Sequence, residues 1–147
     1  MRFNSNLFLL ASLFGVGTAL RRSCKPDDTD PDNSGNGWYT VTRNDNLQKV
    51  ALDFCSKGTD LAKLNVGTPF YDGNIYTVPC KIRRRDCARI PGSDYGYYTV
   101  VDGDLFNAIA SDFCADTTSL KSLNPDTVKK DNSITPGSIL RVPCGWN

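Results

Sequence analysis

The side chains of this chain that could do chemistry are its cysteines and aspartates. Among its 147 residues there is no histidine, and all sixteen acidic residues are aspartates. A Ser-His-Asp triad, a Cys-His pair and a histidine-ligated zinc site are therefore excluded. Disulfide chemistry remains for the six cysteines, and carboxylate chemistry remains for the aspartates.

Two carboxyl groups on either side of a glycosidic bond can hydrolyse it, so an aspartate-based glycosidase is one hypothesis. Asp45 and Asp53 recur in the chain as Asp104 and Asp112, whereas Asp60 does not recur. We expect these aspartates at a helix start and on the outward face of a helix. A module of this size rarely builds the deep cleft that a hydrolase needs. The sequence therefore favours a protein that is not an enzyme.

The N-terminus has the pattern of a secretory signal peptide. Arg2 precedes a short apolar run at residues 7–16, and residues 17–19 form a small-x-small cleavage signal. The apolar run is shorter than the ~20 residues that a membrane-spanning helix needs. We expect residues 1–19 to be removed and the protein to be secreted, extracellular or cell-wall-associated, with no membrane partner. The following Arg21-Arg22 pair could be a dibasic processing site or simply exposed and solubilising.

The chain repeats itself after fifty-nine residues. Residues 51–55 read ALDFC, and residues 110–114 read ASDFC. The same offset aligns Tyr39-Thr40-Val41 with Tyr98-Thr99-Val100, Asp45 with Asp104, Leu61 with Leu120, and Leu64-Asn65 with Leu123-Asn124. After a five-residue insertion, Val78-Pro79-Cys80 aligns with Val142-Pro143-Cys144. So many identities in the same order predict a tandem duplication.

Each copy predicts an opening strand and an amphipathic helix. β-Branched and aromatic residues favour strands at 39–42 and 98–101. Apolar residues spaced i, i+3, i+4, i+7 then predict a helix with one buried stripe. The stripes are Leu47, Val50, Ala51 and Phe54 in the first copy, and Phe106, Ile109, Ala110 and Phe113 in the second. Asp45 and Asp104 precede these helices, where we expect each carboxylate to cap free backbone N–H groups.

A second short helix and a closing strand complete each copy. The helix is predicted to begin at Thr59 or Thr118, and its inward-facing residues are Leu61, Leu64, Leu120 and Leu123. The closing strands are predicted at 74–80 and 138–144, with Pro79 and Pro143 near their ends, as an edge position requires. Each unit is therefore strand, helix, helix, strand, and the fold class is α+β.

These patterns resemble the LysM domain, a βααβ module that binds N-acetylglucosamine polymers. The resemblance rests on the Tyr-Thr-Val strand, the aspartate before the first helix, the Leu-x-x-Leu-Asn helix and the closing Val-Pro, each present twice. The family often has Gly-Asp-Thr before the first helix. The second copy has Gly103-Asp104-Leu105, whereas Asn44-Asp45-Asn46 of the first departs further. With a signal peptide and nothing catalytic, two tandem LysM-like modules stapled by disulfides resemble the secreted LysM effectors of fungi.

The resemblance and the composition together divide the chain into five segments. They are a signal peptide at 1–19, a flexible leader at 20–38, a LysM-like domain at 39–80, a linker at 81–96 and a second LysM-like domain at 97–144. The leader is rich in Asp, Pro, Gly and Asn, so it cannot bury a core. Arg83, Arg84 and Arg85 in the linker are expected to be solvated, although a patch for an anionic surface or a protease site is an alternative.

Six cysteines in a secreted chain should form three disulfides, for which fifteen pairings exist. The cysteines are Cys24, Cys55, Cys80, Cys87, Cys114 and Cys144. If the first three belong to one unit and the last three to the other, at least one bridge crosses between the units. If Cys87 instead joins the first unit, that unit holds four cysteines and the second holds two. Both arrangements are self-consistent.

The resemblance implies a ligand groove between the loop after the first strand and the loop before the closing strand. In the first copy the matching residues are Asn44, Asp45, Asn46, Leu47, Asn65, Val66, Gly67 and Thr68. In the second copy they are Gly103, Asp104, Leu105, Phe106, Asn124, Pro125, Asp126, Thr127 and Val128. Small and turn-forming residues let backbone groups approach a ligand. The same residues could instead be ordinary turns, caps and core.

The implied partners are chitin and chito-oligosaccharides. With a net charge of +1 there is no reason to expect a nucleic-acid partner, and we expect neither a metal nor a cofactor. By resemblance, the protein would hide chitin fragments from host receptors or shield a fungal wall from chitinases, and could dimerise on its ligand. A linker of about 15 residues spans roughly 20 Å if flexible, so both units could capture one oligomer. A structural wall protein held by Arg83 to Arg85 is the alternative.

Full reduction should cost the protein its fold or most of its thermal stability. A unit of about 45 residues has a small core, and a disulfide that closes a loop of about 25 residues contributes roughly 3 kcal/mol in the chain-entropy model. Circular dichroism melts of the oxidised protein and of the reduced, alkylated protein would measure the loss. An unchanged melting temperature would show that the disulfides are not needed.

Overall fold

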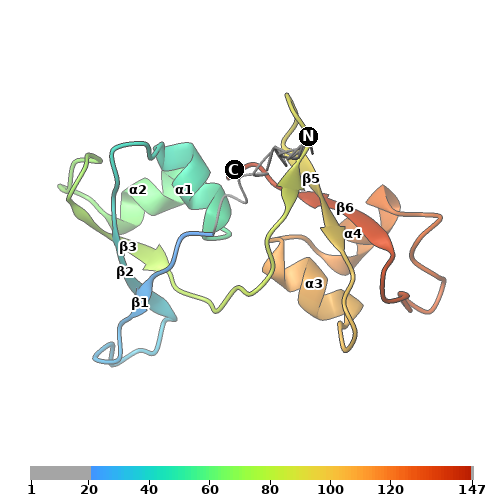
Figure 1. The fold of residues 1–147 in the computed structure, drawn as a ribbon. Helices are drawn as coiled ribbons and strands as arrows, with labels where there is room; N and C mark the ends of the chain where they lie inside the picture. The colour runs from blue at the N-terminus through green and yellow to red at the C-terminus, as the bar shows by residue number, and fades with distance from the viewer. Residues whose placement is uncertain (1–20, 147) are drawn as a thin grey trace, which may run out of the picture.

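The computed structural model describes residues 21–146 and places in them two α+β units with the same order of elements (Figure 1). The N-terminal unit contains β1 (Lys25–Pro26), β2 (Asn36–Thr40), α1 (Leu47–Asp53), α2 (Gly58–Leu64) and β3 (Ile75–Pro79). The C-terminal unit contains β4 (Ala88–Arg89), β5 (Tyr95–Thr99), α3 (Phe106–Asp112), α4 (Thr117–Leu123) and β6 (Ile139–Pro143). The predicted signal peptide lies outside the described residues.

Each unit has a three-stranded antiparallel sheet whose central strand is the opening strand of the repeat. The orders are β1-β2-β3 and β4-β5-β6. The register pairs Tyr39 with Tyr76 and Tyr98 with Leu140. The closing strands lie within one residue of their predicted bounds, and Pro79 ends an edge strand as expected. The opening strands begin three residues before their predicted starts, at Asn36 and Tyr95.

The segments predicted as a flexible leader and a solvated linker each contribute a strand. β1 lies in the predicted leader and pairs with β2, and β4 lies in the predicted linker and pairs with β5. Disulfides Cys24–Cys80 and Cys87–Cys144 tie these segments to the ends of the closing strands. Composition missed both strands because a two-residue strand has too few side chains to show a period.

Glycines in the central strands allow this close approach. A Cβ at Gly37 would lie 2.3 Å from Lys25 O and 2.7 Å from Cys80 Cβ. A Cβ at Gly96 would meet the equivalent atoms of the second unit, 2.6 Å from Ala88 O and 2.7 Å from the Cys144 Sγ. Glycine inside a strand often marks such a contact with another backbone. The same device therefore holds the extra strand and the disulfide in both units.

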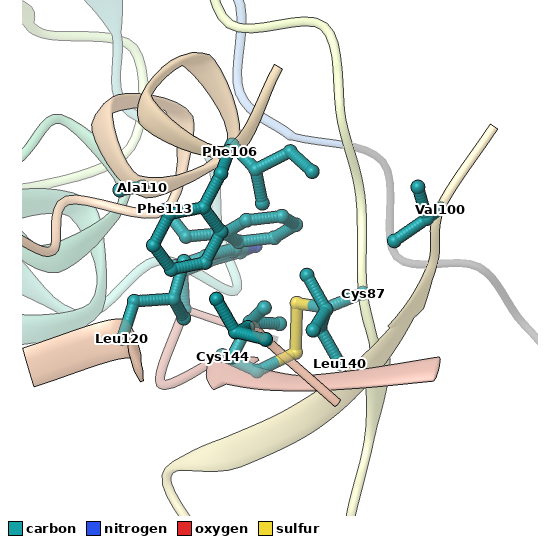
Figure 2. Close-up of a cluster of buried hydrophobic side chains, with 12 residues drawn as sticks. Cys87, Val100, Phe106, Ala110, Phe113, Leu120, Leu140 and Cys144 are labelled. Atoms are coloured by element: carbon teal, nitrogen blue, oxygen red, sulfur yellow. A yellow bond between two sulfur atoms is a disulfide. The ribbon is translucent and has the colours of Figure 1, made fainter. Parts of the chain in front are cut away.

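The two helices of each unit cover one face of its sheet and form the core with it. Val50, Ala51 and Phe54 are buried as the helical stripe predicts. In the C-terminal unit the equivalent residues belong to the same buried cluster as the Cys87–Cys144 disulfide, which lies among apolar side chains (Figure 2). The second helices each bury one leucine, Leu61 or Leu120, but Leu64 is 44% exposed, so its predicted inward position is wrong.

The third disulfide, Cys55–Cys114, crosses between the units. The pairing therefore follows the arrangement with three cysteines in each unit and one crossing bridge. The crossing bridge joins equivalent residues of the repeat, at the C-terminal ends of α1 and α3, and both have a left-handed backbone with φ of 55° and 57°. A contact between identical positions is what a local two-fold arrangement produces. The flexible linker expected from sequence is thus replaced by a covalent joint.

Within residues 21–146, no helix is both long enough and apolar enough to pass through a membrane.

Replacing Gly37 by alanine should destabilise the protein by about 1–3 kcal/mol, because the added methyl meets backbone and disulfide atoms that cannot move freely. Gly58→Ala is the matched control, since its methyl meets only the end of the flexible Gln48 side chain. Denaturant unfolding of both variants measures the difference. Equal stability of the two variants would show that β1 does not lie against β2.

Candidate functional site

The hairpin formed by the two helices brings the predicted ligand loops of each unit to one end. Only residues 54–57 separate α1 from α2, so the chain turns back on itself. The loop that precedes α1 and the first residue of α1, residues 44–47, therefore lie at the same end as residues 65–68, which follow α2. Cys55 lies at the opposite end of the hairpin, so the loops point away from the crossing disulfide. The repeat gives the C-terminal unit the same arrangement.

The loops of the two units lie on opposite sides of the molecule. Figure 1 shows the loop after α2 at the left margin and the loop after α4 at the right margin, with the two helical hairpins between them. A seven-residue helix separates each opening loop from the crossing disulfide, which amounts to about 10 Å of helix. The two candidate grooves therefore do not face each other.

Asp45 fixes the opening loop of the N-terminal unit rather than capping α1. Its Oδ2 accepts hydrogen bonds from the Tyr39 hydroxyl and from the backbone N–H and hydroxyl of Thr42. Its Oδ1 accepts from Arg22 Nε at 2.8 Å. The helix cap is Asn46, whose side chain accepts from the N–H of Gln48 at 2.9 Å. The cap predicted at Asp45 therefore lies one residue later, at Asn46, because the turn after β2 already uses the Asp45 carboxylate.

Asp104 has the same surroundings in the C-terminal unit. Its Oδ2 accepts from the Tyr98 hydroxyl at 2.6 Å and from the Val101 N–H at 3.0 Å. Its Oδ1 accepts from Arg85 Nη2 at 2.6 Å and from Arg85 Nε at 3.0 Å. Leu105 occupies the cap position of α3 without a side-chain hydrogen bond, so the predicted capping role of Asp104 is also wrong. Each opening loop is therefore closed by one aspartate, one tyrosine and one arginine.

These contacts hold the aspartates ionised. Burial opposes ionisation, but hydrogen bonds from Tyr39, Thr42 and Arg22 outweigh it and lower the pKa of Asp45. The pKa of Asp104 is lowered in the same way, against burial, by its tyrosine, backbone and arginine donors. Burial and the facing carboxylate raise the pKa of Tyr39 to about 12. Neither aspartate is available as a proton donor at neutral pH.

Asp53 and Asp112, expected on an outward helix face, are buried. The Arg22 N–H donates to Asp53 Oδ2 at 2.8 Å, and Arg83 Nη1 donates to its Oδ1 at 2.5 Å. Asp112 accepts from the N–H of Arg85 at 2.9 Å and from its Nη1 at 3.0 Å. The helical period put these aspartates outside because it cannot show that a neighbouring chain segment brings cations to them.

The arginines expected to be solvated are therefore mostly structural. The side chain of Arg83 is 5% exposed and that of Arg85 is 20% exposed, whereas Arg84 is exposed. Arg83 precedes the C-terminal unit but lies over the Phe54 ring of the N-terminal unit, at 4.3 Å. Arg21 precedes the N-terminal unit but lies over the Trp146 ring of the C-terminal unit, at 3.9 Å. Each unit is thus contacted by an arginine from the segment that precedes the other unit, and these cation–π contacts strengthen the joint between the units.

Four of the predicted ligand residues are internal. Asn65 Nδ2 donates to Leu61 O and Thr77 O, and its Oδ1 accepts from the Thr77 N–H, so the side chain joins α2 to β3. Asn124 makes the equivalent bonds to Leu120 and Arg141. Val128 is 3% exposed and belongs to the core, as does Phe106 at 4%. These residues can shape the groove but cannot touch a ligand.

The remaining predicted residues form an open ledge at the end of each unit. Val66 is 86% exposed and Leu105 is 65% exposed. Gly67 and Gly103 have positive φ angles of 84° and 82°, which turn their backbone N–H and C=O groups in ways that other residues rarely adopt. Asn44, Asn46, Pro125 and Asp126 are exposed, while Leu47, Thr68 and Thr127 are half-buried. The ledges offer mainly apolar side chains and backbone groups, and Asp126 is an exposed carboxylate on the C-terminal ledge.

Three hollows lie elsewhere, around the joint between the units. One is lined by residues 81–85 with Ser111 and Asp112, one by residues 22–24 with the start of the same linker, and one by Leu52, Tyr95 and Trp146 among others. None of these three is lined by a predicted ligand residue. These three hollows therefore lie away from the ledges.

The residues that sequence analysis missed are Arg22 and Arg85. Both lie two positions before the first cysteine of their unit, in the echo Arg21-Arg22-Ser23-Cys24 and Arg84-Arg85-Asp86-Cys87. This echo has an offset of 63 residues rather than 59, so alignment at a single offset does not find it. A comparison with the offset left free would have extended the repeat back to these arginines.

The stability of the protein should fall as the pH drops below about 4, because Asp45 and Asp104 have folded pKa values below their ordinary 3.8. As the pH falls, these aspartates bind protons in the unfolded chain before they do so in the folded protein. Their contribution to stability is therefore fully present above the ordinary pKa and is lost as the pH falls through the folded pKa. Melting temperatures between about pH 2 and pH 7 test this. Asp45→Asn/Asp104→Asn should flatten the acid limb, and exposed Asp72→Asn should not. An equally steep limb in the double variant would contradict the assignment.

Known proteins resemble this chain in its C-terminal unit and along nearly its whole length. A family model described as the LysM domain matches residues 98–143. The secreted LysM effector Vd2LysM of Verticillium dahliae is 35% identical over 153 residues, covering 97% of this chain and 98% of that protein. The crystal structure of the Bacillus cereus spore cortex-lytic enzyme SleL overlaps 76% of this chain and 23% of its own, at 22% identity and a TM-score of 0.29, too low to compare the folds. The chain belongs to the family of secreted LysM effectors.

Proposed function

We propose that this secreted protein is a non-catalytic chitin-binding effector in which both units are LysM domains. The observation that carries the proposal is that the two units end in ledges built in the same way. The matched C-terminal unit, residues 98–143, has a counterpart in the N-terminal unit with the same element order and the same aspartate–tyrosine–arginine contacts. We place the domain cores at 39–80 and 97–144, with the preceding arginine and cysteine segments as parts of each domain.

The chemistry of the ledges suits an uncharged N-acetylglucosamine polymer. Such a ligand offers hydroxyl and acetamido groups for hydrogen bonds and apolar ring faces and methyl groups for contact. Val66 and Leu105 supply exposed apolar surface, and the turns at Gly67 and Gly103 leave backbone groups accessible. Asp45 and Asp104 beside these residues are already bound by arginines, so neither carboxylate is left as a free charge at its ledge.

The occupied aspartates also support a binding role rather than hydrolysis. A glycosidase needs one carboxyl group that is protonated and one that is free to attack or to activate water. Asp45 and Asp104 are held ionised, and Asp53 and Asp112 are buried against arginines. Each of these carboxylates thus has a structural task that catalysis would interrupt.

Membership of the effector family supports two uses of chitin binding. Free fragments bound by the protein would be hidden from chitin receptors of a host, and a coated wall would be shielded from chitinases. Because the ledges lie on opposite sides, a short oligomer cannot reach both at once, so the joint capture expected from a flexible linker is not retained. One molecule would instead hold two oligomers or connect two polymer strands. Assembly of two molecules on one long oligomer would follow from the same geometry.

A structural wall protein held by its arginine cluster is the second candidate. Arg83 and Arg85 are engaged with aspartates inside the protein, which leaves Arg84 as the exposed member of the cluster. One exposed cation gives weak attachment to an anionic polymer. Binding that disappears at high salt would favour this candidate, because screening weakens charge contacts and leaves contacts to an uncharged sugar largely intact.

Calorimetric titration with chito-oligosaccharides of increasing length tests the proposal. We expect binding of two oligomers per protein molecule, with affinity that changes little between low and high salt. Leu105→Ala should weaken binding at the C-terminal ledge several-fold, because it removes exposed apolar contact area. Ile82→Ala is the matched control, since Ile82 is 82% exposed but lies in the linker, outside the ledges.

The outcomes separate the candidates. Absence of heat and of any retention on chitin by the oxidised protein would reject the proposed function. Release of reducing ends from purified chitin would show an enzyme. Equal weakening by Leu105→Ala and Ile82→Ala would place the ligand away from the ledge.

A further inference from the structure

We propose that Arg22 and Arg85 are positioning residues for the ligand ledges. Each reaches from the segment before the first cysteine of its unit and fixes, through one aspartate, the loop that carries exposed ledge residues. This inference rests on the proposed function for its ligand but on separate contacts for its mechanism.

The contacts of Arg22 link the ledge to the interior of the N-terminal unit. Its Nε donates to Asp45 at 2.8 Å in the opening loop, and its Nη1 lies 3.4 Å from the Oδ2 of buried Asp53. Its backbone N–H donates to Asp53 at 2.8 Å, and its carbonyl accepts from Arg83 Nη2 at 2.6 Å. Arg22 is thus bound by its backbone as well as by its side chain, which keeps its direction fixed.

The loop depends on this arrangement because Asp45 closes it from within. The Thr42 N–H donates to the carboxylate of Asp45 at 2.7 Å, and the Asp45 N–H donates back to Thr42 O at 2.9 Å. Asn46, which caps α1, is the next residue. Without Arg22 the carboxylate of Asp45, 3% exposed, would lose its cation and turn toward water. The turn from Thr42 to Asn46 would then open.

Arg85 repeats the design from a different part of the chain. It joins Asp104 at 2.6 Å to buried Asp112 at 3.0 Å, while its backbone N–H donates to Asp112 at 2.9 Å. We call this arrangement, one arginine bound both to the loop aspartate and to a buried aspartate, the lock. The two units therefore show the lock twice, independently. The N-terminal lock depends on where the mature chain begins, because a protein cleaved after Arg22 would keep Arg85 and lose Arg22. Cleavage after the dibasic Arg21-Arg22 pair would therefore remove the contacts of Arg22 with Asp45 and Asp53.

The test is a chitotriose titration of the full oxidised protein, followed residue by residue in amide NMR spectra. Arg22→Gln should weaken binding at residues 44–47 and 65–68 at least tenfold, with less than a twofold change at residues 103–106 and 124–128. Arg85→Gln should do the reverse. Arg22→Lys keeps the positive charge but lacks the guanidinium that contacts both Asp45 and Asp53, so it should weaken binding less than Arg22→Gln. Arg43→Gln is the matched control, because the Arg43 side chain, in the same turn, is 89% exposed and lies 4.0 Å from Asp72.

Unchanged binding at the N-terminal ledge of folded Arg22→Gln, or equal weakening at both ledges, would overturn the inference. If Arg22→Gln does not fold, Asp45→Asn keeps the Arg22–Asp53 contacts and should show the same loss at one ledge. Unchanged binding of that variant would equally overturn it. If the parent protein binds neither chitotriose nor longer chito-oligosaccharides nor chitin, the proposed function fails. The lock is then tested by hydrogen exchange, which Arg22→Gln should accelerate at the Thr42 amide and not at the Val101 amide.

Discussion

The disulfide between Cys55 and Cys114 is the constraint on which the arrangement of this protein depends. It joins the same position of the repeat in both units, at the ends of α1 and α3 that lie farthest from the candidate ledges. The ledges consequently face outward, on opposite sides of the molecule. Arg83 on Phe54 and Arg21 on Trp146 add contacts across the same joint. The two similar units thus carry two separate candidate ledges on a fixed frame rather than two parts of one cleft.

Small cores explain why so much of the chain is tied by disulfides and ion pairs. Each unit buries one small apolar cluster, which includes Phe54 in the N-terminal unit and both Phe106 and Phe113 in the C-terminal unit. Burying Asp53 would be costly without a partner, and two arginines meet it, Arg22 and Arg83. Because these arginines come from the segments before the cysteines, the same contacts that satisfy the aspartates also hold those segments in place. In each unit the ion pairs therefore connect the buried core to the ledge.

Sequence analysis predicted the repeat, the order of elements and the buried helical stripes, because these depend on patterns within one segment. Val50 and Ile109 are buried as the period requires. It failed where two distant segments meet. The period placed Asp53 outside, and composition made the leader and the linker flexible, since neither pattern shows that Arg22 and Arg83 reach the same carboxylate. The predicted ligand residues include Val66 and Leu105, which are exposed. They also include Asn65 and Asn124, whose side-chain amides instead join a helix to a strand inside the unit. Turn-forming residues look alike in sequence whether they face a ligand or a neighbouring strand.

The distance between the two ledges is the most direct measure of the fixed outward arrangement. Spin labels carried by unnatural amino acids at Lys63 and Ser122, exposed equivalent positions on α2 and α4, would leave the six cysteines untouched. Double electron–electron resonance should give one narrow distance distribution, the same with and without a chito-oligosaccharide. A broad distribution in the free protein that contracts to a shorter distance on adding ligand would show units closing on one oligomer, and would contradict the fixed arrangement.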